Sequence, residues 1–272
     1  MVNSGWWIVA IRIKLTLQYK GTAYCGWQVQ PNGVTIQEIL EKTLHRLFQK
    51  KINVIGSGRT DSGVHALGQV GHFDVPVDGG SWMVDGKLQR FVHSLNSLLP
   101  DDIAVIDAKI VPDTFHAQKS AKKKIYDYFI LNSRIRSPFL TDTVWQIPVP
   151  LDIKKMRQAA KLLIGEHDFR AFCASDSTAK TTVRQIYRIS IGKIPLNPPL
   201  TKGESKGDLI RIAISGNGFL KYMVRNVVGT LVEVGKGRMT VTEFKKAFRS
   251  CDRKRTGQTA PARGLVLRKV VY

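Results

Sequence analysis

The same order of predicted strands and helices occurs twice in this chain, and that order limits the folds that it can adopt. In the first occurrence, apolar and polar residues alternate strictly over residues 11–20, which predicts a strand with one buried face. Further strands are predicted at 52–55, 69–75 and 103–110, and helices at 36–48 and 84–98. Residues 11–112 therefore have the order β-α-β-β-α-β, a split βαβ arrangement.

The second half of the chain repeats this order with one helix added. Strands are predicted at 124–131, 183–191, 209–215 and 265–271, and helices at 152–163, 219–232 and 242–249. A long connection with Pro138 and with prolines at 148 and 150 follows the first of these strands. Asp152 is placed to cap the helix that comes next.

Together the two patterns predict an α+β fold of two ferredoxin-like (βαββαβ) halves. We expect them to lie side by side, to form one extended antiparallel sheet with helices on one face, and to hold the substrate in a central cleft. The halves are placed at residues 11–115 and 116–272, after an N-terminal extension at 1–10. Residues 195–207 contain three prolines and two glycines between two strands, which predicts a loop insertion that is dispensable for chemistry.

The charge of the chain indicates its class of partner. It has 42 lysines and arginines against 21 aspartates and glutamates, a formal net charge of +21. Such an excess favours a polyanion, either a nucleic acid or an anionic membrane surface, although a basic protein with no such partner is the alternative. No apolar run approaches the roughly 20 residues that a membrane-spanning helix needs, and no signal-peptide pattern follows the N-terminus. We therefore expect a cytoplasmic protein that binds nucleic acid and no membrane.

Neither a disulfide framework nor a metal site is predicted. The three cysteines, Cys25, Cys173 and Cys251, are odd in number and far apart, and none belongs to a CxxC pair. The six histidines show no HxxxH spacing. The sequence therefore predicts a protein without metal or cofactor.

A glycine-rich loop at residues 56–66, Gly-Ser-Gly-Arg-Thr-Asp-Ser-Gly-Val-His-Ala, carries the strongest candidates for chemistry. Its three glycines allow sharp turns and a close approach of substrate. Asp61 is the only carboxylate of the loop, and Arg59 two residues away favours its ionised form, which suits a nucleophile or a base. Alternatively, Asp61 caps a turn. His65 is expected to make a structural hydrogen bond.

A second group of candidates lies on the strand that opens the second half. Tyr126 and Tyr128 are two residues apart and share a face of that strand. Three basic residues, Lys122, Lys123 and Lys124, precede them. Aromatic rings beside lysines suit stacking on an unpaired base next to phosphate contacts. The alternative is that the two tyrosines line a core.

The last candidates lie near the C-terminal end of the sequence. Lys221 and Arg225 are four residues apart in an otherwise apolar segment, so on a helix they share a face that contacts either an anion or solvent. Leu265 and Val266 follow Ala-Pro-Ala-Arg-Gly at 260–264, and either could pack against a base or simply enter a core strand.

Four of these segments resemble motifs of the tRNA pseudouridine synthase A family (TruA). Residues 58–66, GRTDSGVHA, are similar to the family's GRTDAGVHA, with Ser62 in place of alanine. The basic run before Tyr126 is similar to a stretch that leads into Tyr-x-Tyr, although Ile125 stands where a basic residue is common. Residues 219–226 resemble F-x-x-M-V-R-N, and residues 260–265 resemble A-P-A-x-G-L. The resemblance covers about residues 11–272, with the motifs in the family's order.

The resemblance implies a role for each candidate residue. Asp61 is the catalytic aspartate, Tyr126 stacks on the target uracil and takes part in removing the C5 proton, and Arg225 pairs with the aspartate. Arg59 contacts a phosphate or fills the gap left by a displaced base, while Leu265 or Val266 packs against the uracil. Weaker RNA contacts are expected from Lys122, Lys123, Lys124 and Lys221.

The implied reaction is isomerisation of uridine to pseudouridine at positions 38, 39 and 40 in the anticodon arm of tRNA. The resemblance also implies a homodimer that needs no cofactor. One alternative is a non-catalytic RNA-binding protein built on two ferredoxin-like units, and another is a pseudouridine synthase for a different structured RNA. An Arg-x-Asp sequence on a glycine loop favours the enzyme, because a binding module has no need of it.

Overall fold

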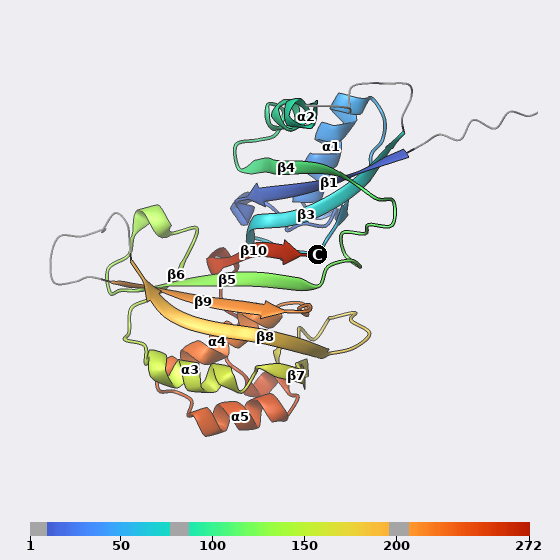
Figure 1. Cartoon of the computed structure of the whole chain (residues 1–272). Coiled ribbons are helices and arrows are strands. Elements are labelled where there is room, and N and C mark those ends of the chain that lie inside the picture. Colours follow the sequence, from blue (N-terminus) through green and yellow to red (C-terminus); the bar gives the residue numbers. More distant parts are fainter. Residues whose placement is uncertain (1–9, 77–86, 196–206) are drawn as a thin grey trace, which may run out of the picture. The chain divides into compact units, whose positions relative to one another are not determined.

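The computed structural model describes residues 10–76, 87–195 and 207–272, and its contacts divide the chain into two compact units (Figure 1). Unit 1 contains the chain up to Ser62, Ala66–Ala121 and Tyr272, and unit 2 contains Gly63–His65 and Lys122–Val271. Only the last residue of the predicted N-terminal extension and the two end residues of the predicted insertion are described. The rest of both segments lies outside the described residues.

Unit 1 has the element order that the sequence predicts. Its elements are β1 (Ala10–Tyr19), α1 (Ile36–Phe48), β2 (Ile55–Gly56), β3 (His65–Pro76), α2 (Lys87–Asn96) and β4 (Ile103–Val111). Strand β1 lies between β4 and β3, β2 pairs with β3, and all these pairs are antiparallel.

Both helices of unit 1 cover the same face of its sheet. The alternation predicted for β1 is confirmed, because its odd-numbered apolar residues from Ile13 onward are buried. Ile13 lies opposite Phe73 of β3, so the two side chains share a face. The ring of Phe73 packs against Phe48 at the end of α1 and against Phe91 of α2. These contacts place α1 and α2 over the buried face of β1 and β3.

The strand predicted at 52–55 is wrong in its bounds, because β2 contains only Ile55 and Gly56. The backbone of Val54 bonds to side chains of α1 instead of to a neighbouring strand. Its N–H donates to the Glu41 carboxylate at 2.8 Å, and its carbonyl accepts from the Gln37 amide at 3.0 Å. These side chains satisfy the backbone groups that a longer ladder would have used.

Unit 2 contains a mixed sheet in the order β10-β5-β9-β8-β7, in which β6 pairs in parallel with β5 and all other pairs are antiparallel. Its strands are β5 (Lys123–Asn132), β6 (Trp145–Ile147), β7 (Gly165–Asp168), β8 (Val183–Ile194), β9 (Asp208–Gly216) and β10 (Leu265–Val271). Its helices are α3 (Ile153–Lys161), capped by Asp152 as predicted, α4 (Met223–Gly235) and α5 (Val241–Arg249). Strands β6 and β7 were not predicted, because three and four residues are too few for a clear alternation.

Helix α4 begins four residues later than predicted. Tyr222 has a φ of 61°, in the left-handed region, so the residues before it form a turn and the helix starts at Met223. The predicted helical face shared by Lys221 and Arg225 is therefore wrong. Instead, the Lys221 ammonium forms an ion pair with Asp176 at 2.5 Å.

These units confirm an α+β fold with open sheets. The side-by-side arrangement of the halves and the cleft stay predictions. No helix in the described part of the chain is long and apolar enough to cross a membrane.

Candidate active site

The loop that carries Asp61 is fixed on one side by residues that follow β1. The Trp27 N–H donates to the Thr60 carbonyl at 3.1 Å, and the Ser62 hydroxyl donates to the Tyr24 carbonyl at 3.2 Å. Gly26 has a φ of 87°, and a Cβ there would lie 2.5 Å from the Thr60 oxygen. Only glycine allows this approach without strain. The chain is thus held on both sides of Asp61, at Thr60 through its carbonyl and at Ser62 through its hydroxyl.

On its other side the loop is fixed by buried polar side chains. Gln69 of β3 is fully buried, accepts from the Ser57 hydroxyl at 2.7 Å and donates to the Gly58 carbonyl at 3.0 Å. The Tyr19 hydroxyl at the end of β1 lies 2.9 Å from the Thr60 hydroxyl. Buried polar groups that are satisfied in this way define one conformation of the backbone around them.

Within this fixed loop, exposure differs from residue to residue. Thr60 is buried, Asp61 is half-buried, and Arg59 is exposed. A carboxylate at the surface of a rigid loop can reach a substrate and keeps its position when it does so, as a base or a nucleophile requires. Arg59 is available to a phosphate or a base outside the loop.

His65 is placed for structure, as predicted. It is buried, and its Nε2 lies 2.9 Å from the Asp142 carbonyl and 3.0 Å from the Arg263 carbonyl. Two carbonyl acceptors require a proton on this nitrogen, so His65 donates to both. The bonds fix the short turn that precedes β10.

Tyr126 lies on β5 in unit 2. It pairs with Ile214 of β9 and with Leu267 of β10, so its ring shares a face with these apolar residues. The ring is 8% exposed and meets the Phe219 ring edge to face, with the centroids 5.2 Å apart. The core alternative for Tyr126 is thus partly correct. A small exposed area on a fixed ring still suits contact with a single base.

Arg225 is tied to the segment that leads into β10. Its Nε donates to the Ala260 carbonyl at 2.8 Å, and its own carbonyl accepts from the Ala260 N–H at 3.1 Å. Its guanidinium lies 4.9 Å from the centroid of the Tyr222 ring. The backbone and the side chain of Arg225 are therefore both fixed, by its place in α4 and by its two bonds to Ala260. The left-handed Tyr222 that ends the preceding turn also supplies a stacking surface.

Packing against Tyr128 requires a glycine at position 264 of the Ala-Pro-Ala-Arg-Gly-Leu motif. A Cβ on Gly264 would lie 2.6 Å from the Tyr128 ring, and the Tyr128 hydroxyl donates to the Pro261 carbonyl at 2.8 Å. Burial raises the pKa of Tyr128, against the opposing effect of the Arg225 and Arg263 charges, so the hydroxyl stays a donor. The core alternative for Tyr128 is confirmed.

Strand register separates the two residues predicted to pack on the uracil. Leu265 lies opposite Tyr128 and therefore on the face of the sheet that both tyrosines share. Val266 lies opposite Asp127, on the other face. Leu265 can thus share a ligand with Tyr126, whereas Val266 is directed to the opposite side.

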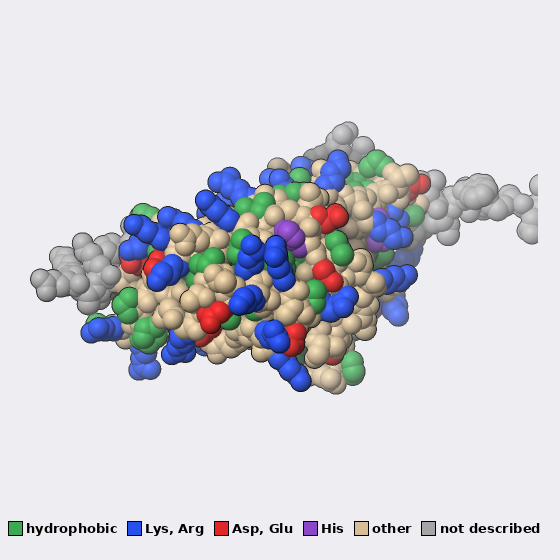
Figure 2. All heavy atoms as spheres, turned by 90° about the horizontal axis from the view of Figure 1, so that it is seen from below, with side chains coloured by type: hydrophobic (Ala, Val, Ile, Leu, Met, Phe, Trp, Pro, Cys, Tyr) green, Lys and Arg blue, Asp and Glu red, His purple; other side chains and the backbone are tan. Residues whose placement is uncertain are grey.

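Basic side chains are spread over the surface of unit 2. Lys122 is exposed, and burial with the nearby Arg184 charge lowers the pKa of Lys124. Figure 2 views the molecule from the side on which α5 lies in Figure 1 and shows lysines and arginines in excess of acidic residues. The exposed basic residues of α5 and the turn after it are Lys245, Lys246, Arg249, Lys254 and Arg255.

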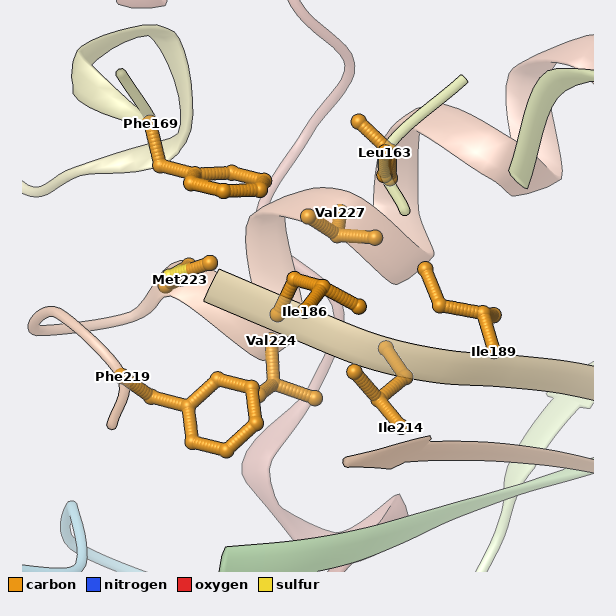
Figure 3. A pocket seen from close by; sticks show the side chains of 9 residues that line it. All are labelled: Leu163, Phe169, Ile186, Ile189, Ile214, Phe219, Met223, Val224 and Val227. Atoms are coloured by element: carbon orange, nitrogen blue, oxygen red, sulfur yellow. The ribbon is translucent and has the colours of Figure 1, made fainter. Parts of the chain in front are cut away.

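A small cavity of about 10 Å³ lies between β8, β9 and α4, and Figure 3 shows its nine apolar side chains. It holds no polar group that could orient a base, and it has room for about one water molecule. Phe219, which touches Tyr126, forms part of its wall. We regard it as a packing gap behind Tyr126.

Comparison with known proteins decides the family. The family model described as tRNA pseudouridine synthase matches residues 16–118 and 159–272. The chain belongs to the tRNA pseudouridine synthase family. The tRNA pseudouridine synthase A of Myxococcus xanthus is 46% identical over 261 residues, which cover 96% of this chain and 92% of the relative. Proteins of the same description from Thermoanaerobacter sp. (strain X514) and Citrifermentans bemidjiense are 42% and 44% identical, over 96% of this chain and 99% and 97% of theirs.

The family confirms the resemblance and the predicted class of activity. The synthase is an isomerase that acts on tRNA, and the alternative of a non-catalytic binding protein is not supported. Within the described ranges, no group of three or more His, Cys, Asp or Glu side chains could hold a metal ion.

Sequence reasoning missed the residues that hold the Asp61 loop. The loop is held by four residues that lie outside its motif: Tyr19, Gly26, Trp27 and Gln69. The alternation of β1 predicts that Tyr19 is buried, which is a weak signal for its role. Nothing in the spacing indicates that the Gln69 amide faces the loop.

Proposed function

We propose that this synthase converts uridine to pseudouridine at positions 38, 39 and 40 in the anticodon arm of tRNA, with Asp61 as the essential carboxylate. The observation that supports this most is the loop geometry. Asp61 lies in the signature segment, half-buried, between Thr60, whose carbonyl accepts a hydrogen bond, and Ser62, whose hydroxyl donates one. A carboxylate held so firmly keeps its position when a uridine arrives.

The reaction needs no redox partner, since it only exchanges one bond for another. The N1–C1′ glycosidic bond breaks, the uracil turns, and C5 bonds to C1′. C5 then loses a proton and N1 gains one. Asp61 could add to C6, attack C1′, or take a proton from C2′, and each route requires the ionised carboxylate. An asparagine at this position can perform none of them.

The other site residues take supporting roles in this proposal. Tyr126 stacks on the target uracil and assists removal of the C5 proton, and Leu265 packs against the same base. Arg225 pairs with the catalytic carboxylate and favours its ionised form. Its own fixed position, between the Ala260 carbonyl and the Tyr222 ring, supports such a role. Arg59 contacts a phosphate or replaces the displaced base.

The remaining parts of the proposal concern RNA and assembly. Phosphate contacts come from Lys122, Lys123 and Lys124, with a weaker one from Lys221, whose ammonium already contacts Asp176. The strand order in each unit supports the ferredoxin-like description of both halves. As in the resembled family, we infer a homodimer in the cytoplasm.

The test is tritium release from tRNA labelled at uridine C5. Asp61→Asn should release none above background and should bind tRNA within a few-fold of the unaltered protein. Asp101→Asn is the matched control, because Asp101 is exposed and lies outside the loop. Turnover by Asp61→Asn would refute the assignment. Transcripts that keep a uridine at only one of the three positions then map the sites.

Two substitutions at Tyr126 separate stacking from proton removal. Tyr126→Phe keeps the ring and its packing on Phe219, whereas Tyr126→Ala removes both. If stacking dominates, the phenylalanine variant should lose far less kcat than the alanine variant. Equal loss in both would assign the effect to the hydroxyl.

A further inference from the structure

The connection between β5 and β6 carries two large apolar side chains that are exposed to solvent. Phe139 is 89% exposed, the largest fraction among the large apolar side chains of the described residues, and Ile135 is 57% exposed. Single exposed apolar residues are ordinary on protein surfaces. Two within five residues, on one short connection, indicate a contact surface.

This connection is rigid. Both ends are joined by the parallel pairing of β5 with β6, and the Asn132 amide donates to the carbonyl of Ile147, the last residue of β6, at 2.9 Å and to that of Val149 at 2.7 Å. The Gln146 amide donates to the Ser133 carbonyl at 3.1 Å. At the tip, Phe139 lies in a 3₁₀ turn, Pro138–Leu140, which the Thr141 hydroxyl closes by a bond to the Pro138 carbonyl at 3.0 Å. Because these bonds fix the backbone that carries the ring, binding costs less entropy than it would on an unsupported loop.

The surroundings of the ring are cationic. Arg134 and Arg136 are exposed, and Asp142 is the one acidic residue of the connection, residues 133–144. Within the described ranges neither guanidinium forms an ion pair with a carboxylate. Two arginines and a ring thus lie within six residues, against a single acidic residue in the whole connection.

We propose that Phe139, flanked by Arg134 and Arg136, is a stacking platform for an unpaired base of the RNA substrate. Guanidinium groups bind phosphate in bidentate fashion, and every base has a face on which an aromatic ring can stack. RNA is favoured over a second copy of this chain as the occupant, because Arg134 and Arg136 meet opposite charge on the RNA backbone but like charge on a second copy of the same surface. The inference rests on the family's tRNA substrate and not on the role of Asp61.

The base on Phe139 is not the target uridine. Tyr126, which the proposed function assigns to the target uracil, is buried in β5, whereas Phe139 is exposed on the connection that follows this strand. Phe139 would therefore hold a base other than the reacting one. Its loss should therefore weaken binding and raise KM, while kcat remains unchanged.

Four variants test the platform in the tritium-release assay and in direct tRNA binding. Phe139→Ala should raise KM and Kd roughly 5- to 100-fold, the range for loss of one stacked base. Phe139→Trp should retain affinity and Phe139→Leu should not, because stacking needs a π face and not only apolar area. Tyr187→Ala is the matched control, an aromatic residue that is 43% exposed elsewhere in unit 2, and it should change neither constant.

The arginines are tested by salt dependence. Arg134→Gln with Arg136→Gln should lower the slope of log Kd against log salt by roughly 1 to 1.5, since each contact to single-stranded phosphate contributes about 0.7. Arg90→Gln, an exposed arginine on α2, is the control and should leave the slope unchanged. All variants should keep their melting temperature, because the altered side chains are exposed.

Two results would overturn the inference. One is a Phe139→Ala variant whose KM and Kd stay within two-fold of the unaltered protein. The other is a variant that dissociates into smaller species in sedimentation while it binds RNA normally, which would assign the surface to a second copy of the chain. The outcome of Asp61→Asn tests the proposed active site and not the platform, so the two proposals can fail independently of each other.

Discussion

Replacement of Gln69 by leucine should loosen the Asp61 loop without altering a side chain that RNA can touch. Gln69 is fully buried, accepts from the Ser57 hydroxyl at 2.7 Å and donates to the Gly58 carbonyl at 3.0 Å. Leucine has a similar size but can make neither bond. The Gly58 carbonyl loses its donor, which costs about 1–3 kcal/mol, and the Ser57 hydroxyl loses one of its bonds, which costs about 0.5–1.5 kcal/mol, so the sum is about 1.5–4.5 kcal/mol.

This loss has a thermal and a catalytic consequence. For a chain of this size, 1 kcal/mol shifts the melting temperature by about 2–4 °C, so Gln69→Leu should melt about 3–18 °C lower. Below that temperature the variant is folded, but Ser57 and Gly58 no longer hold the start of the loop. We expect kcat to fall at least ten-fold while KM for tRNA stays unchanged, because the carboxylate is displaced and the RNA-binding surface is not.

Calorimetry and single-turnover tritium release measure the two effects. Gln89→Leu is the matched control, since Gln89 is exposed on α2 and its replacement should change neither quantity. Ser57→Ala offers a milder test if Gln69→Leu fails to fold, because it removes one of the two bonds. A lower melting temperature with unchanged kcat would refute the argument that Gln69 positions the loop. An unchanged melting temperature would refute the energetic estimate as well.

Three further predictions concern stability. Gly229→Ala should lower the free energy of unfolding by at least about 2 kcal/mol in urea titration, because its Cβ would lie 1.7 Å from the Gln258 carbonyl oxygen; unchanged stability would show that α4 can shift there. Asp127→Asn should cost about 2–3 kcal/mol, since this buried carboxylate is bound by two arginines of the sheet; a neutral effect would mean that the ion pairs only offset their desolvation. Burial and the Arg12 charge lower the pKa of His72, so stability should be full above about pH 6.5 and fall as the pH drops below it. Melting between pH 7.5 and 5.5 should therefore show a smaller drop for His72→Gln than for the unaltered chain, and an equal drop would assign the effect elsewhere.

Long alternating strands were predictable from this sequence, and short or irregular elements were not. Residues 265–271 were predicted and found as β10, and β1 is displaced by only one residue. Strand β1 has a clear two-residue period, and β10 is a run of five apolar residues interrupted only by Arg268 and Lys269. By contrast, the 52–55 prediction failed because side chains of α1 took the backbone bonds of Val54, a tertiary effect that local pattern does not contain. The predicted start of α4 was wrong because an apolar turn has the same composition as an apolar helix.

The residues of the candidate site also differ in whether the sequence alone could identify them. The signature loop and the arginine of α4 could be found from motif resemblance, because a motif is local in sequence. Which of Leu265 and Val266 faces Tyr126 could not, because the answer depends on the register of β10 against β5. Similarly, the bond from the Gln69 amide to the Gly58 carbonyl could not be predicted, because it depends on how β3 lies beside the loop.

The motif of residues 58–66 is therefore necessary for the geometry of Asp61 but does not produce it alone. The loop contains glycines that would let it adopt many conformations, and each of its fixing bonds comes from outside the motif. Gly26 permits the approach of the Thr60 carbonyl, and Gln69 holds the Gly58 carbonyl from the other side. The same motif without these two residues should present a mobile carboxylate, which would bind uridine poorly placed for attack. The position of the Asp61 carboxylate, which we propose to be catalytic, is thus set by the packing of unit 1 around the loop.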